Sequence, residues 1–285
     1  MCDEFTLADD KATLSRRQFG AIGAAAAALG MAGEAMAATP AGLNEATVSI
    51  TTPDGTCDAF FVHPTKGKYP AVILWPDIGG LRESHMVQAR WIAAKGYAVL
   101  AVNQYYRGGK APVLPSFAAW RTPEGQATLK PMIAQINPGA TTRDAKAFVA
   151  WLDKQAAVNT KRGIGTCGFC MGGPMTVRTA AAVPSRVRAA ASFHGGGLVG
   201  DAVDAPIKLL PATKASYLFA IAKNDDARAP GDKDALKAAA AAAGRKAEIE
   251  VYSGDHGWTV PDAPIYNKAE GDRAFARMYA LFAGL

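Results

Sequence analysis

The sequence predicts an α/β fold built on a mostly parallel, twisted sheet with helices on both faces. Short, predominantly apolar runs recur along the chain, as at residues 71–75, 98–102 and 216–222, and each is typical of a strand covered on both faces. Segments with helical periodicity separate these runs. In addition, a strand pattern at residues 164–175 leads through a glycine-framed turn into a helix pattern.

An antiparallel hairpin is expected before the parallel strands. Residues 47–52 alternate in polarity and are rich in β-branched side chains, and residues 57–63 resume a strand pattern. The Pro-Asp-Gly-Thr stretch at 53–56 between them has the composition of a turn. We expect this hairpin at an edge of the sheet.

The rest of the chain alternates between helix and strand patterns, which favours a single domain over residues 38–285. The irregular stretch 105–137 contains prolines and is expected to form loops or short helices over a functional site. The other expected elements are a helix that ends at Gly96, a helix at 142–152, a strand from 164, a helix from 171, strands at 188–193 and 247–252, and helices at 232–243 and 270–285.

Residues 1–37 are predicted to be an export signal. The pair Arg16 and Arg17 precedes an Ala/Gly-rich run at 21–32, and the Ala-Met-Ala of 35–37 suits a signal peptidase. The paired arginines resemble a twin-arginine signal, which implies the twin-arginine export machinery as a partner and a periplasmic or secreted protein. A stable membrane anchor is disfavoured because the apolar run is shorter than the ~20 residues that span a bilayer.

The charge distribution argues against nucleic-acid binding. The net charge is +6, but the lysines and arginines are dispersed and nowhere form a run of five or more. A mildly basic surface of this kind is compatible with a small anionic substrate.

Cys170 is the candidate nucleophile. It lies at the centre of a G-x-C-x-G pattern, and Gly168 and Gly172 leave room for a strained strand-to-helix turn. A helix beginning near Met171 directs its positive dipole end toward the sulfur, which favours a thiolate. The competing interpretation of the same residues is a buried, inert cysteine.

A base and a carboxylate follow Cys170 in the order typical of α/β-hydrolases. Asp225 and Asp226 come directly after the strand at 216–222, and His256 follows the strand at 247–252. Both groups are therefore expected at strand carboxyl ends, where a nucleophile, a base and an orienting acid could meet. Residue spacing leaves both aspartates open as the acid.

These motifs together resemble the dienelactone hydrolase family. The resemblance is carried by the elbow at 168–172, Pro-Asp-Ile-Gly-Gly at 76–80, Tyr-Tyr-Arg at 105–107 and Asp-His-Gly-Trp at 255–258. It implies an α/β-hydrolase fold and hydrolysis of a small ester or lactone through an acyl-thioester, without a metal or cofactor.

The resemblance assigns roles to individual residues. Cys170 is expected to be the nucleophile, His256 the base, and Asp225 the orienting carboxylate, with Asp226 as the alternative. Asp77 lies where the family has a glutamate that contacts the resting thiol. The following backbone N–H, of Ile78, and that of Met171 are expected to form the oxyanion hole.

Substrate-binding roles are implied for Arg107, Tyr106 and Trp258. Arg107 matches a family arginine that holds a substrate carboxylate. A second family arginine, shortly after the catalytic histidine, has no counterpart at residues 257–262. This difference argues against dienelactone itself as the substrate.

Two alternatives belong to different classes. Cys167 and Cys170 form a C-x-x-C pattern, which is compatible with a thiol-disulfide or metal-binding module. With Cys57 they make an odd set of cysteines after residue 37, which does not suit a disulfide framework. The second alternative is a non-catalytic binding protein on a hydrolase scaffold.

Overall fold

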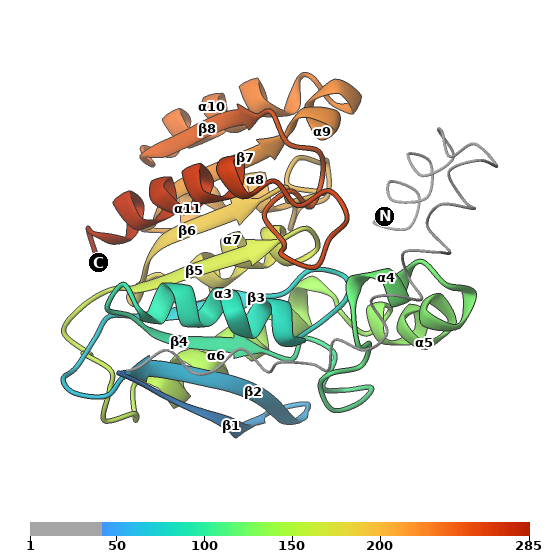
Figure 1. The fold of residues 1–285 in the computed structure, drawn as a ribbon. Helices are drawn as coiled ribbons and strands as arrows, with labels where there is room; N and C mark the ends of the chain where they lie inside the picture. Colours follow the sequence, from blue (N-terminus) through green and yellow to red (C-terminus); the bar gives the residue numbers. More distant parts are fainter. Residues whose placement is uncertain (1–41) are drawn as a thin grey trace. The chain divides into compact units, whose positions relative to one another are not determined.

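The computed structural model describes residues 42–285, which form an eight-stranded sheet in the order β1-β2-β4-β3-β5-β6-β7-β8 (Figure 1). The β1/β2 and β2/β4 pairs are antiparallel, and all other neighbouring strands are parallel. The expected mostly parallel sheet with an antiparallel hairpin at its edge is confirmed. The expected signal at residues 1–37 lies outside the described residues, as does its boundary with the domain.

The elements have the following bounds. The strands are β1 (Leu43–Thr52), β2 (Gly55–Pro64), β3 (Ala71–Trp75), β4 (Ala98–Val102), β5 (Ile164–Phe169), β6 (Val187–Phe193), β7 (Ser216–Ala222) and β8 (Ala247–Tyr252). The helices are α3 (Glu83–Ala93), α4 (Phe117–Trp120), α5 (Pro123–Ile133), α6 (Pro138–Leu152), α7 (Gly172–Ala182), α8 (Pro206–Leu209), η2 (Leu210–Ala212), α9 (Lys223–Arg228), α10 (Asp232–Ala242) and α11 (Lys268–Phe282).

The central strands are covered on both faces. Every residue of β3, β4 and β5 is buried, as their apolar runs predict. Helices α3 and α11 cover one face, and α6 and α7 cover the other (Figure 1). β8 lies at the edge, where Glu248 and Glu250 form ion pairs with Arg277 and Arg273 of α11, so charged side chains protect the exposed strand.

The stretch after β4 contains two short helices, α4 and α5, at the end of the sheet to which the parallel strands point (Figure 1). The next helix, α6, begins at Pro138 and not at the expected residue 142. It begins early because the side chain of Asn137 accepts a hydrogen bond from the Ala140 N–H and proline suits the first helical turn. Among residues 42–285, no helix combines the length and apolar character needed to cross a membrane.

Candidate active site

Cys170 occupies a strained turn between β5 and α7. Its φ is 52°, a left-handed value that is unusual for a residue with a side chain. The turn requires glycine on both sides: a Cβ at Gly168 would lie 2.1 Å from the Gly172 carbonyl oxygen, and one at Gly172 would lie 2.3 Å from the Trp75 carbonyl oxygen. The local structure therefore has the geometry of a nucleophile elbow, packed directly against the end of β3.

His256 and Asp225 meet at the carboxyl ends of β8 and β7. The Lys223 N–H donates to the Gly254 carbonyl at 3.0 Å, and the His256 N–H donates to Asn224 Oδ1 at 2.8 Å, so the two strand ends are tied together. His256 Nδ1 then donates to Asp225 Oδ2 at 2.6 Å. This bond leaves Nε2 as the ring nitrogen able to exchange a proton with a nucleophile.

The two aspartates that spacing left open have different partners in the structure. Asp225 contacts His256. Asp226, the next residue, accepts two hydrogen bonds from Lys233 Nζ, at 2.8 Å and 2.9 Å. They lie in α9, a short helix that the sequence patterns did not predict, and successive helical residues point in different directions.

The charge state of His256 depends on its surroundings. Burial by itself disfavours the imidazolium, but the Cys170 sulfur and the Asp225 carboxylate outweigh it and raise the pKa of His256 to about 10. At neutral pH the imidazole is therefore protonated and places a positive charge beside the Cys170 sulfur.

A second histidine, His194, lies beside the first. Its φ is 41°, Nδ1 accepts a hydrogen bond from the Cys170 N–H at 3.1 Å, and Nε2 lies 3.0 Å from Thr259 Oγ1. Its ring centroid is 4.9 Å from that of His256. Burial and the neighbouring His256 hold the pKa of His194 well below its ordinary value, so the ring is neutral and positions the elbow.

The N–H groups of Ile78 and Met171 are available to a ligand. Within residues 42–285 neither group donates a hydrogen bond, although both residues are buried. The Tyr105 hydroxyl donates to the Ile78 carbonyl at 2.8 Å and lies 4.0 Å from Met171 Sδ, which links the two segments. Two unpaired N–H groups beside a nucleophile are the requirement for an oxyanion hole.

The structure gives Asp77 other partners than the thiol. Both its carboxylate oxygens accept hydrogen bonds from Arg82, at 2.6 Å and 2.9 Å, and Oδ2 lies 3.3 Å from His85 Nε2. Burial favours the neutral acid, but Arg82 and His85 lower the pKa of Asp77 well below its ordinary value. Arg82 also binds Asp262, at 2.7 Å and 2.8 Å, so two carboxylates neutralise one buried guanidinium.

Arg107 and Tyr106 belong to an ion-pair cluster between the β1/β2 turn and α6. The Arg107 guanidinium donates to Asp54 at 2.6 Å and to Asp144 at 2.8 Å and 2.9 Å, and it lies over the Tyr106 ring. The Tyr106 hydroxyl donates to Asp144 at 2.8 Å and also lies 2.7 Å from Thr52 Oγ1. Both side chains that were expected to bind substrate are thus engaged by the protein itself.

Trp258 has no exposed surface. Its ring lies edge-on to His194, with centroids 5.2 Å apart, and stacks on Tyr252 at 5.3 Å. The indole therefore packs against His194 and is not open to a substrate.

Sequence patterns missed the pairing of Arg82 with Asp77 and Asp262, and they also missed Gln104, whose amide binds the Asp77 carbonyl at 2.7 Å. The sequence did contain a signal for the arginine pairing, namely Asp262, an acidic residue in the segment where the resembled family has an arginine. Its partner Arg82 is 180 positions away, so no local pattern connects them.

The second cysteine of the C-x-x-C pattern is not paired with Cys170. Cys167 and Cys170 are both free thiols, and burial in β5 raises the pKa of Cys167. A raised pKa disfavours the thiolate that disulfide exchange and metal binding require. In the part of the chain that the structure describes, no group of histidine, cysteine and acidic residues is arranged to hold a metal ion.

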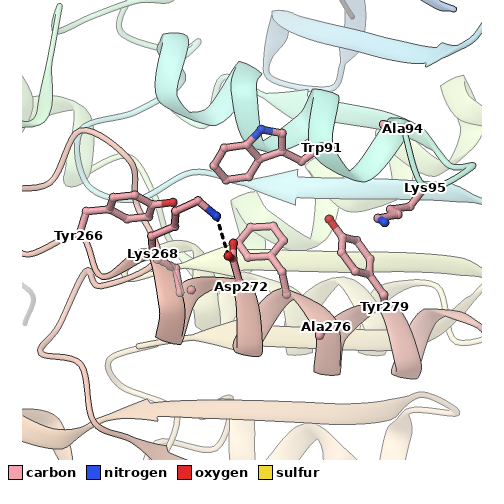
Figure 2. A pocket seen from close by; sticks show the side chains of 11 residues that line it. Trp91, Ala94, Lys95, Tyr266, Lys268, Asp272, Ala276 and Tyr279 are labelled. Atoms are coloured by element: carbon pink, nitrogen blue, oxygen red, sulfur yellow. Dashed lines mark hydrogen bonds and ion pairs between the residues drawn. The ribbon is translucent and has the colours of Figure 1, made fainter.

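A groove on the surface of the described residues lies apart from Cys170. It has a volume of about 570 Å³ and lies between α3 and α11, lined by Trp91, Tyr266, Phe275 and Tyr279 with two lysines (Figure 2). One of these, Lys268, pairs with Asp272 at 2.6 Å. The groove is open to solvent over the flanking helices.

The chain is similar in sequence to known proteins. Residues 57–285 match the dienelactone hydrolase family. A Methylorubrum extorquens protein named "Putative carboxymethylenebutenolidase" is 28% identical over 281 residues, covering 95% of this chain and 93% of that protein. An Escherichia coli K12 protein of the same name is 26% identical over 241 residues, covering 82% and 84%.

Solved structures share the fold. The crystal structure named "Putative Dienelactone Hydrolase" from Klebsiella pneumoniae has a TM-score of 0.74 at 22% identity and covers 85% of this chain and 99% of that one. The family match extends from the middle of the hairpin to the last residue and includes the elbow and both histidines. The chain therefore belongs to the dienelactone hydrolase family of the α/β-hydrolase superfamily, and it is a hydrolase.

Proposed function

We propose that the protein hydrolyses small carboxylic esters or lactones, with Cys170 as the nucleophile, His256 as the base and acid, and Asp225 as the orienting carboxylate. The observation that carries this proposal is the 2.6 Å bond between His256 and Asp225 on the strand ends beside the strained Cys170. Asp225 orients the ring through Nδ1 and leaves Nε2 for the sulfur.

The first half-reaction forms an acyl-thioester. The Cys170 thiolate attacks the carbonyl carbon, and the carbonyl oxygen takes the negative charge between the N–H groups of Ile78 and Met171. The C–O bond of the ester then breaks, and the imidazolium of His256 gives its proton to the departing alkoxide. In a lactone the alcohol stays attached to the acyl group.

The second half-reaction returns the resting enzyme. Neutral His256 takes a proton from water, and the hydroxide attacks the thioester carbonyl. The C–S bond breaks, the carboxylic acid leaves, and the thiolate again pairs with the imidazolium. No metal or cofactor takes part in these steps.

We expect neutral esters to be accepted as well as anionic ones. Arg82 and Arg107 are each matched by two carboxylates of the protein. An anionic substrate would gain no unneutralised partner from either.

We also propose that the protein is exported. The support is the sequence alone, namely Arg16 and Arg17 ahead of the Ala/Gly-rich run at 21–32.

A panel of p-nitrophenyl esters and unsaturated lactones tests the proposed activity, with Cys170→Ala and Cys167→Ser as paired variants. We expect Cys170→Ala to abolish hydrolysis and Cys167→Ser to retain it, because only the first thiol reacts. Equal loss in both variants would favour a function of the cysteine pair, and turnover by Cys170→Ala would exclude the mechanism.

A further inference from the structure

We propose that Gln104 is a positioning residue for the oxyanion hole, and that its side-chain amide sets the direction of the Ile78 N–H. This role rests on the proposed function, in which the Ile78 N–H stabilises the developing oxyanion.

The contact is made to the peptide group that contains this N–H. Gln104 follows β4 and is buried, with 3% of its surface exposed. Its Nε2 donates to the Asp77 carbonyl at 2.7 Å and lies 3.4 Å from the Pro76 carbonyl. The Asp77 carbonyl and the Ile78 N–H belong to one planar trans peptide, in which the two groups point in opposite directions. A donor that fixes the carbonyl therefore also fixes the N–H.

Other donors hold the carbonyls around this peptide. The Gly80 N–H donates to the Asp77 carbonyl at 3.0 Å, the Tyr105 hydroxyl binds the Ile78 carbonyl, and Arg82 binds the Gly80 carbonyl at 3.1 Å. Whereas these carbonyl groups are all hydrogen-bonded, the Ile78 N–H has no acceptor within residues 42–285. Such preorganisation avoids reorienting the peptide when the oxyanion forms.

The glutamine is not explained by stability alone. Its Oε1 is buried and has no hydrogen-bond partner among the described residues. An unpaired buried oxygen is unfavourable, and an apolar side chain of similar length would remove that penalty. The Asp77 carbonyl would still keep its bond from the Gly80 N–H. The Gln104 amide therefore adds a second hydrogen bond to the Asp77 carbonyl, in the peptide group that carries the Ile78 N–H.

The test compares two reactions of the same sulfur in Gln104→Met and Gln104→Leu. Acylation of Cys170 by p-nitrophenyl acetate develops an oxyanion, whereas alkylation by iodoacetamide does not. Deleting an oxyanion donor outright costs about 10²- to 10³-fold, so misorienting one should slow acylation roughly 10-fold. We expect alkylation to stay within about twofold and the thermal midpoint to be unchanged or higher, since the unpaired oxygen is gone.

Thr166→Val is the matched control. The buried Thr166 hydroxyl donates to the Ile73 carbonyl of β3 at 3.1 Å, so this variant also removes a side-chain bond to a backbone carbonyl, but away from the oxyanion loop. Both reaction rates should be unchanged.

The role of Gln104 is overturned by normal acylation in both variants, by equal loss of acylation and alkylation, or by failure of both variants to fold. Two replacements of different shape are used so that a packing defect in one does not decide the result. Absence of Cys170 acylation in the wild type would instead refute the proposed function itself.

Discussion

Replacing Asp225 by asparagine tests the proposed triad with almost no change in side-chain shape. The variant loses the carboxylate that accepts the 2.6 Å hydrogen bond from His256 Nδ1. Hydrogen bonds to charged groups contribute about 1.5 to 3 kcal/mol, and one pH unit corresponds to about 1.36 kcal/mol. The pKa of His256 is raised to about 10 in the native protein and should therefore fall by roughly one to two pH units in the variant.

Activity should fall further than this electrostatic change alone implies. The asparagine NH₂ group can turn toward Nδ1, which would place the remaining imidazole proton on Nε2, facing Cys170. A ring in that tautomer cannot accept a proton from the thiol or from water, and the same exchange in a serine triad costs about 10⁴-fold. Because a thiol ionises more readily than a serine hydroxyl, we expect a loss of roughly 100-fold in kcat/KM for p-nitrophenyl acetate.

The neighbouring aspartate provides the control. Asp226→Asn removes the same charge one residue away, where the carboxylate binds Lys233 and not His256. The measurements are kcat/KM and the pH dependence of Cys170 alkylation by iodoacetamide. Asp226→Asn should stay within about twofold of the wild type on both, since its partly exposed ion pair with Lys233 does not contact His256. Wild-type activity in Asp225→Asn, or an equal loss in Asp226→Asn, would refute the assignment of the acid.

Four further predictions concern the nucleophile, the arginine cluster, pH and export. Cys170→Ser should retain little of the wild-type turnover of aryl esters, because a hydroxyl ionises far less readily than a thiol, and undiminished turnover would contradict a thiolate nucleophile. Arg107→Ala should lower the free energy of unfolding by about 3 kcal/mol, because it removes the guanidinium that pairs with the buried Asp144 carboxylate. It should change kcat/KM equally for a carboxylate-bearing lactone and a neutral aryl ester, and a selective loss on the lactone would place Arg107 at the substrate. The raised pKa of His256 means that its stabilising contribution is complete below its unfolded pKa of about 6.5 and is lost as the pH rises to about 10. Urea unfolding of the wild type and His256→Gln should therefore differ most near pH 6 and converge above pH 10, and a constant difference would argue against the ion pair. Changing Arg16 and Arg17 to lysine should leave precursor in the cytoplasm, whereas the mature wild type should begin near residue 38; a cytoplasmic wild type with an intact N-terminus would contradict export.

Elements that depend on local patterns were predictable from the sequence. The strands at 71–75, 98–102, 216–222 and 247–252 have the same bounds in the structure. The apolar or alternating pattern of their side chains reflects the burial of each strand. Turn residues before and after each pattern mark where the strand begins and ends. The elbow at Cys170 was likewise visible, because its two flanking glycines are a local steric requirement. Chain order then placed a histidine and an acid at strand carboxyl ends, since parallel strands share one functional edge.

The pairing of side chains across that edge was decided only by the tertiary structure. Spacing could not separate Asp225 from Asp226, because the choice depends on the direction in which α9 leaves β7. Arg107 matched a substrate-binding motif by position, yet folding places it between Asp54 and Asp144, 53 and 37 positions away. Charged and polar side chains bind whichever partner the sheet order brings within about 3 Å. Contacts of this kind between distant residues produce no periodic pattern in the sequence. The local sequence therefore determined where the candidate catalytic residues lie along the chain, and the packing of distant segments decided which of them are in contact.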